Sequence, residues 1–186
     1  MVRLLSGGVD WLVLNEPEAA TVLGHPVAGL AGARPAAAAL AQAGARHAEP
    51  TRAAYQASGA PAEQWQVEAF LDDMPRRFAA ADLVLARSGA STVAELAAAG
   101  KPAVLIPFPQ AADDHQRRNA EVMAQAGAAR VLVEADLTAD QLMGTVSDLL
   151  AAPGSLREMA ENARTLAHPD AAERIAGMAL ALKGRQ

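Results

Sequence analysis

The sequence predicts an α/β fold in which a mostly parallel sheet of about five strands is covered by helices on both faces. Short runs such as LVLA (83–86) and AVLIPF (103–108) are apolar at every position, as expected for strands that are buried on both sides. Alanine-rich helical segments separate these runs. Alternation of strands and helices is typical of doubly wound, Rossmann-like folds.

The predicted strands are short and lie mainly in the second half of the chain. Between residues 16 and 64 no segment has strand character, and the run AAAAL (36–40) is interpreted as helix. A change in composition near His47 is the candidate boundary between residues 1–47 and 48–186, which we expect to form one compact domain. The predicted strands are 11–15, 65–70, 83–86, 103–108 and 130–134.

Helix boundary signals mark the second half of the chain. STVAELAAAGKP begins with hydroxyl residues and has Glu95 three positions after Thr92, the pattern of a capping box. DDHQRRNAEVMAQAGAA starts with two acids at the positive end of a helix and stops at Gly127. Further helices are expected from Thr138 to a break at Pro153, over SLREMAENARTLA, and over DAAERIAGMALALKG.

Composition limits the classes of function. The chain has 186 residues, of which 52% are apolar, enough to bury a core without cross-links. Its net charge is −5 with no basic block, so a nucleic-acid surface is not expected. No apolar run has membrane-spanning length and no signal peptide is recognised. Because cysteine is absent, thiolate metal sites are excluded, and a cytoplasmic protein without a cofactor is expected.

Ligands of open α/β sheets bind beyond the carboxyl ends of the strands, where helix N-termini meet the crevice. The strand at 83–86 is followed by RSGAST (87–92). Gly89 would let a ligand approach the backbone, and the amides of residues 89–92 could hold a diphosphate. One turn later, Glu95 could accept hydrogen bonds from a ribose diol. These residues therefore form a candidate nucleotide site.

Simpler interpretations of these residues stay open. Glu95 could only complete a capping box, Gly89 could only form a tight turn, and Ser88 could only be a helix-start hydroxyl. In DDHQRRNA (113–120), Asp113 and Asp114 are interpreted as helix-start charges rather than catalytic acids. One histidine beside two acids makes a poor metal site because ligands need spacing. We therefore assign no catalytic residue and no metal ligand.

Three stretches in a fixed order, RSGASTVAE, DDHQRRNA and PDAAERIA, lie in a segment that closely resembles the C-terminal domain of the MurG family. The resemblance covers residues 48–186. Members of this family are peptidoglycan N-acetylglucosaminyltransferases that use UDP-GlcNAc and make lipid II. Their C-terminal domain is the donor-binding half of a two-domain glycosyltransferase of the GT-B type.

The resemblance implies a role for each matching residue. The backbone of Leu71 would hold the uracil edge, the segment from Ser88 to Ala90 would lie near the diphosphate, and Glu95 would take the ribose hydroxyls. His115 and Gln116 would face the GlcNAc hydroxyls. Helix amides could stabilise the departing UDP without a metal. Together with the helix amides, the candidate nucleotide-binding residues are Leu71, Ser88, Gly89, Ala90, Thr92 and Glu95, and the candidate sugar-binding residues are His115 and Gln116.

The sequence also departs from the family. There, the first strand of the domain runs into a Gly-Gly-Ser loop over the diphosphate, and the second strand leads to a His-Gln-Thr-Gly stretch. Neither is found here, and RHAEPTR (46–52) stands where the second strand is expected. Residues 9–45 resemble a segment of ribokinase-like (PfkB-type) sugar kinases, in which a strand ends in Asn-x-x-Glu, here Asn15 and Glu18. We interpret the chain as a chimera of two related folds, without kinase activity.

Three functions therefore stay open. The chain could be the UDP-GlcNAc-binding half of a transferase, inactive alone because the acceptor-binding domain of the family is missing. It could be a chimeric fold without a ligand, or a domain like that of UDP-GlcNAc 2-epimerases. The last helix carries an apolar face that predicts packing on the first segment or on a second copy in a homodimer. This face comprises Ile175, Met178, Leu180 and Leu182.

Overall fold

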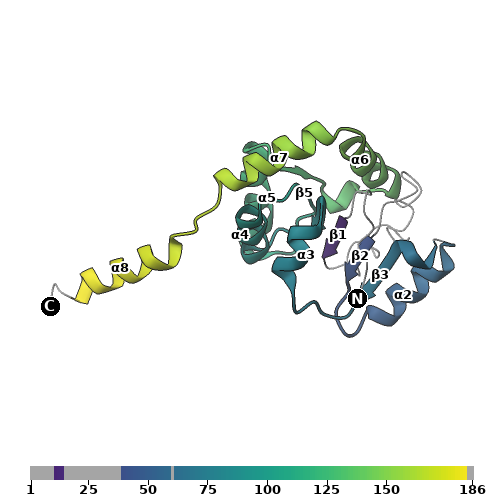
Figure 1. Cartoon of the computed structure of the whole chain (residues 1–186), viewed down its shortest axis with the longest axis horizontal. Coiled ribbons are helices and arrows are strands. Elements are labelled where there is room, and N and C mark those ends of the chain that lie inside the picture. Colours follow the sequence, from purple (N-terminus) through teal and green to yellow (C-terminus); the bar gives the residue numbers. More distant parts are fainter. Residues whose placement is uncertain (1–10, 15–38, 60, 184–186) are drawn as a thin grey trace.

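A computed structural model describes residues 11–14, 39–59 and 61–183. Among these residues, six strands form one sheet in the order β3-β2-β1-β4-β5-β6, and every neighbouring pair is parallel (Figure 1). This is the strand order of a doubly wound Rossmann-like sheet, so the predicted fold class is confirmed. The strands are β1 (Trp11–Leu14), β2 (Ala39–Gln42), β3 (Trp65–Glu68), β4 (Leu83–Ala86), β5 (Ala103–Leu105) and β6 (Ala129–Val131).

Strand β2 corrects the prediction that no strand lies between residues 16 and 64. Ala39–Gln42 pairs with β1 on one side and β3 on the other, although the run 36–40 was interpreted as helix. Alanine favours helices, but in a sheet interior the partners on both sides decide the conformation. The segment 46–52, which was placed at the second strand, instead follows β2 and enters helix α2 (Ala48–Ala57).

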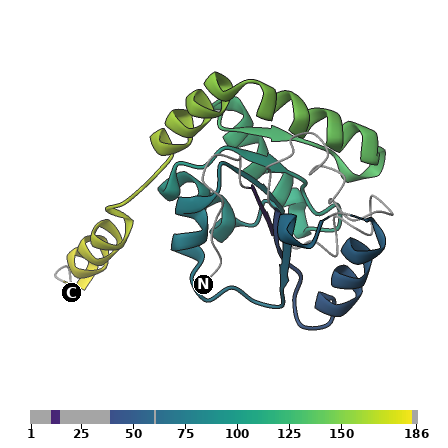
Figure 2. The same ribbon diagram turned by 45° about the vertical axis from the view of Figure 1, so that its right-hand side comes forward.

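Helices cover both faces of the sheet (Figure 2). Side chains of β4 alternate between two buried clusters: Leu83 and Leu85 belong to one, and Val84 and Ala86 to the other. This explains why the strands read as continuous apolar runs. The first cluster is completed by α2, α6 (Ala139–Ala151) and α7 (Pro153–Thr165), and the second by α3 (Met74–Ala80), α4 (Ala90–Ala99) and α5 (His115–Gln125).

The start of α4 differs from the prediction. The helix begins at Ala90 with Gly89 as its N-cap, and no side chain caps it. Thr92 therefore lies inside the first turn, and the capping box predicted for Thr92 and Glu95 is wrong. A capping box does form at the start of α6, where helix initiation at Thr138 is confirmed.

The start of α5 also differs in detail. A short 3-10 turn, Ala112–Asp114, precedes the helix, which begins at His115. Asp113 and Asp114 have φ angles of 51° and 54°, a left-handed conformation that aspartate tolerates better than most residues. The two acids thus shape the approach to the helix and do not lie in its first turn.

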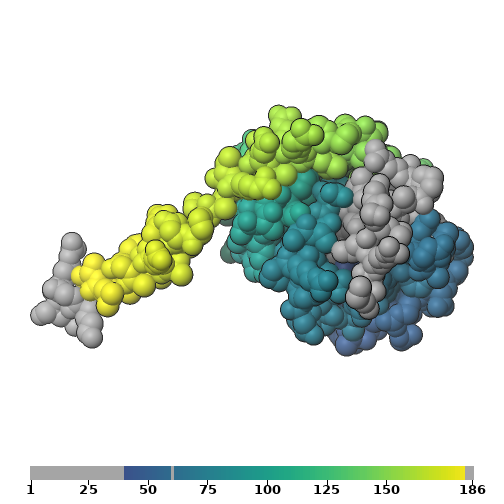
Figure 3. All heavy atoms as spheres, in the orientation of Figure 1, coloured from purple at the N-terminus to yellow at the C-terminus, as the bar shows by residue number. Residues whose placement is uncertain are grey.

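Helix α8 (Ala171–Lys183) extends away from the rest of the molecule (Figures 1 and 3). Its apolar side chains Ile175, Met178, Leu180 and Leu182 are 67–70% exposed. The predicted packing of this face on the first segment is not seen among the described residues, and the homodimer stays a hypothesis. No helix in the described ranges is long and apolar enough to cross a membrane.

Candidate functional site

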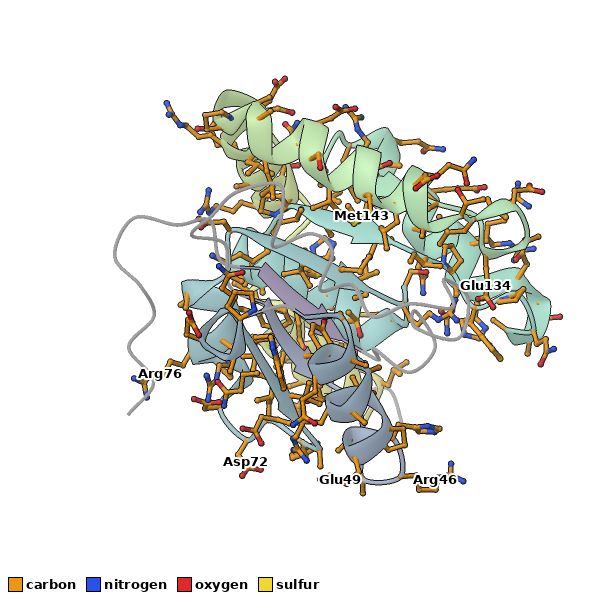
Figure 4. All side chains as sticks on the ribbon, turned by 90° about the vertical axis from the view of Figure 1, so that its right-hand side faces the viewer. Arg46, Glu49, Asp72, Arg76, Glu134 and Met143 are labelled. Carbon is orange, nitrogen blue, oxygen red and sulfur yellow. The ribbon has the colours of Figure 1, made fainter. Side chains whose placement is uncertain are left out.

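The loops that carry the predicted site residues share one edge of the sheet. Because all six strands are parallel, their carboxyl ends lie at the same edge. The order of the strands reverses between β1 and β4, which places the loop after β4 at the switch point where ligands of such sheets bind. Asp72 after β3 and Glu134 after β6 mark the two ends of this row of loops (Figure 4). Asn15 and Glu18 lie outside the described residues.

Gly89 lies at the switch point, and neither its backbone conformation nor the packing around it requires a glycine. Its φ and ψ are −60° and 151°, which any residue can adopt, so the tight-turn interpretation is wrong. A Cβ added there would meet only Thr92 Oγ1, at 3.9 Å. The first backbone hydrogen bond of α4 runs from Val93 to Gly89, which leaves the preceding amides for a ligand or water. With the positive end of the helix dipole, these amides suit an anion.

Ser88 ties this loop to helix α5. Its side chain is fully buried, and its Oγ donates to the backbone oxygen of Gln116 at 2.7 Å. Asn119 Nδ2 donates in turn to the Ser88 backbone oxygen at 3.0 Å. The hydroxyl proton of Ser88 is therefore donated within the protein, and the loop after β4 is held to helix α5.

Gln116 and His115 present complementary hydrogen-bonding atoms at the start of α5. The Phe108 amide donates to Gln116 Oε1 at 3.0 Å, and since an amide N–H only donates, the Gln116 Nε2 is left as the outward donor. His115 Nδ1 lies 2.6 Å from the Ala112 oxygen. A carbonyl only accepts, so this contact places a proton on Nδ1, and in that tautomer Nε2 is an acceptor. A neighbouring donor and acceptor match a sugar diol.

The loop after β3 is held by a residue that the sequence analysis did not select. The Leu71 amide donates to Gln42 Oε1 at 3.1 Å, and the Leu71 side chain is buried. Gln42 ends β2 and is followed by Ala43 and Gly44. Residues 41–44 read Ala-Gln-Ala-Gly, so the His-Gln-Thr-Gly stretch itself is not present, although a glutamine and a glycine stand at the end of β2. Neighbouring Phe70 is 70% exposed.

Glu95 lines a cleft between α3 and α4. The cleft has a volume of about 420 Å³, and Glu95 is the one charged residue among those that line it. Its remaining lining residues are small or apolar: Met74, Pro75, Phe78, Ala79, Ala98 and Ala99. Met74 follows Leu71 by three positions. The structure therefore brings Glu95 close to the segment that was predicted to hold a nucleobase.

Two charged groups near this edge have defined partners. A hydrogen bond from Arg77, at 2.8 Å, holds the pKa of Asp73 below its usual value. Arg87, which is only 8% exposed, forms an ion pair with Glu134, a pair that the sequence analysis also missed. Among the described residues, no group of three or more histidine, aspartate or glutamate side chains is placed to hold a metal ion.

Comparison with known proteins decides the family. The model of the glycosyltransferase family 28 C-terminal domain matches residues 21–175. The chain belongs to this family. It is 48% identical over 134 residues, 72% of this chain, to the UDP-N-acetylglucosamine–N-acetylmuramyl-(pentapeptide) pyrophosphoryl-undecaprenol N-acetylglucosamine transferase of Geobacter sp. (strain M21). The enzyme of the same name from Paraburkholderia phymatum is 47% identical over 144 residues, 77% of this chain. The family 28 chain spans 35% and 38% of the lengths of these two relatives.

Solved structures agree with this assignment. Acinetobacter baumannii MurG superposes with a TM-score of 0.81 at 31% identity, over 95% of this chain and 53% of that chain. S. aureus MnaA with UDP superposes with a TM-score of 0.69 over 91% of this chain and 44% of that chain, but at 13% identity it shares only the fold. The MurG-like match extends into residues 9–45. The ribokinase-like interpretation of that segment gains no support from these matches.

Proposed function

We propose that this family 28 domain binds UDP-N-acetylglucosamine and is the donor-binding part of an N-acetylglucosaminyltransferase that forms lipid II. The observation that carries the proposal is the open start of α4. Gly89 has neither a strained backbone nor a crowded Cβ position, and uncapped amides follow it at the switch point of the sheet. The relatives at 46–50% identity are named as UDP-N-acetylglucosamine-dependent transferases, and the sugar nucleotide in this proposal is taken from them.

In this proposal the donor lies along the row of loops. The amides from Gly89 to Thr92, with Ala90 between them, hold the diphosphate, and Glu95 accepts hydrogen bonds from the ribose. The uracil meets the Leu71 backbone, whose amide donates to Gln42. The exposed ring of Phe70 offers a surface on which a base can stack.

The sugar is assigned to the other end of the row. His115 Nε2 accepts from one GlcNAc hydroxyl, and Gln116 Nε2 donates to a second. Ser88 contributes by fixing the Gln116 backbone, so we now give it a positioning role rather than direct contact through its hydroxyl. No catalytic residue is assigned in this chain.

Transfer by the chain alone is not expected. The aligned segments cover only 35% and 38% of these relatives, which are roughly twice as long as this chain. Transfer also needs an acceptor site and closure around the donor. The cytoplasmic location expected from the sequence belongs to the same proposal. Likeness to UDP-GlcNAc 2-epimerases at 12–15% identity concerns the fold alone, and no residue of the site favours that activity.

Isothermal titration with UDP-GlcNAc, UDP and ADP tests the proposal. Wild type should bind the two uridine ligands and bind ADP more weakly. Glu95→Gln should weaken both uridine ligands, since it halves the carboxylate's acceptor capacity toward the ribose diol, whereas Glu161→Gln on the exposed surface of α7 is the matched control. Absence of heat with UDP and UDP-GlcNAc, together with an unchanged unfolding temperature, would support the fold without a ligand.

A further inference from the structure

A buried arginine joins three neighbouring loops at the carboxyl edge of the sheet. Arg87 follows β4 directly, and its Nη1 donates to the backbone oxygens of Ile106 and Pro107 after β5, at 3.1 and 3.2 Å. The same guanidinium is paired with the carboxylate of Glu134 in the turn after β6. Arg87 therefore spans the ends of three adjacent strands.

The contacts of Arg87 continue to the sugar-binding end of the proposed site. Its guanidinium lies over the Phe108 ring, 5.4 Å from the ring centre, in the range of a cation–π contact. The amide of this same Phe108 donates to the Gln116 side chain. Ser88, next to Arg87 in sequence, holds the Gln116 backbone. Gln116 is thus fixed at both ends by groups attached to the Arg87 loop.

We propose that the Arg87–Glu134 pair is a positioning device for sugar recognition. The pair fixes the β5–α5 loop so that the Phe108 amide holds Gln116 Oε1 and turns Gln116 Nε2 toward the sugar hydroxyls. This inference rests on the proposed function, because it assigns the selectivity of the same site for the sugar part of its ligand. Neither Arg87 nor Glu134 touches the ligand in this proposal.

The arrangement differs from a pair that only stabilises the fold. A buried ion pair contributes little net stability because its desolvation offsets its attraction. Here the arginine donates hydrogen bonds to two backbone carbonyls of the loop between β5 and α5. That loop has little regular secondary structure. The pair therefore sets the path of the loop, and the side chain that benefits is Gln116.

The test compares the two uridine ligands. We measure Kd for UDP and UDP-GlcNAc in wild type, in Glu134→Gln, in Gln116→Ala and in the double variant. Glu134→Gln keeps the size of the side chain and removes its charge. It should reduce the preference for UDP-GlcNAc over UDP about two- to tenfold, the effect of one hydrogen bond, and leave Kd for UDP unchanged. In the Gln116→Ala background it should not change this preference further.

A purely structural role would give a different result. It would weaken both ligands equally or only lower the unfolding temperature, and either outcome with an unchanged preference overturns the proposal. Glu121→Gln, which removes the exposed partner of Arg117 on α5, is the matched control and should change neither Kd.

A second readout needs no ligand. Hydrogen exchange of the Phe108 amide and the NMR shifts of the Gln116 side-chain NH2 group should change in Glu134→Gln and in Arg87→Lys but not in Glu121→Gln. Unchanged exchange and shifts in both of the first two variants would refute the positioning role, even if wild type bound neither ligand. If wild type binds neither UDP nor UDP-GlcNAc, that result would count against the proposed function and not against the positioning role.

Discussion

Gly89→Ala separates folding from ligand binding more sharply than any other single change. The substitution adds one methyl group at the start of α4, where it would meet only Thr92 Oγ1 at 3.9 Å. The backbone there has φ −60° and ψ 151°, which alanine adopts without strain. The fold should therefore accept the methyl group. A diphosphate that binds to the helix amides should bind more weakly, because in this proposal the added methyl group lies where the anion approaches.

The expected change in stability is small because two effects oppose each other. Alanine at a compatible site restricts the unfolded chain and stabilises by about 0.4–1 kcal/mol. Alanine is also a poorer N-cap than glycine, by an amount on the order of 0.5–1 kcal/mol. The net change in the free energy of unfolding should stay within about 1 kcal/mol. For a domain of this size that is roughly 2–4 °C in unfolding temperature.

The expected change in binding is larger. A hydrogen bond to a charged group contributes about 1.5–3 kcal/mol. Displacing the diphosphate from one amide should therefore raise Kd for UDP about tenfold to more than a hundredfold. Uridine, which lacks the diphosphate, should bind wild type and Gly89→Ala alike. This contrast identifies the diphosphate as the part of the ligand that the methyl group blocks.

The assay pairs thermal unfolding with titration of UDP and uridine. Gly144→Ala is the matched control, because its added Cβ meets nothing within 4 Å and lies in the middle of α6, away from the proposed site. It should stabilise by about 0.5–1 kcal/mol and leave UDP binding unchanged. Full UDP affinity in Gly89→Ala would show that the α4 amides do not hold the diphosphate. Loss of the fold would show that the position is crowded after all.

Three further predictions concern the fold. Gly127→Ala should destabilise by about 1–2 kcal/mol or more in urea unfolding, because φ is +75° and the new Cβ would lie 2.8 Å from Asn162 Nδ2. Thr138→Ala should cost about 1 kcal/mol in the same assay by removing the α6 cap, and Thr138→Ser should restore it. The pKa of Asp73 is lowered by Arg77, so its stabilisation is complete above its ordinary value of 3.8 and is lost as pH falls through the lowered value. Asp73→Asn should therefore be less stable than wild type at neutral pH, and an equal deficit at about pH 2 would contradict this assignment.

The fold class could be predicted because several strands are apolar at every position. Strand β2, which was not predicted, shows where this kind of prediction fails. β4 and β5 contain valine and leucine, whose pattern signals burial on both faces. β2 reads ALAQ within an alanine-rich region, and alanine alone favours helix. Its strand conformation comes from parallel neighbours on both sides. These neighbours lie far away in the sequence, so no local pattern could reveal them.

The candidate site was predicted unevenly for a similar reason. Motif order pointed to Gly89, Glu95 and Gln116. Gly89 follows the end of β4, whereas Glu95 lies within α4 and Gln116 in the first turn of α5. The partners that orient them come from other loops. Glu134 lies 47 positions from Arg87, and Gln42 lies 29 positions from Leu71. A composition or spacing rule cannot find such pairs, because nothing near either residue depends on the other.

The proposed site also suggests separate tasks for two parts of the longer relatives. The part that matches this chain would bind the donor, and the remaining part would be needed for transfer. The groups assigned to the diphosphate, ribose and sugar all lie within the described residues of this chain, so we expect that donor binding does not need another domain. Ala90, Glu95 and His115 are exposed, however, and electrostatic interactions that face water are weaker than those in an enclosed site. Stabilisation of a departing UDP demands that enclosure. A second domain closing over this edge would therefore raise the rate of transfer far more than it raises affinity for the donor.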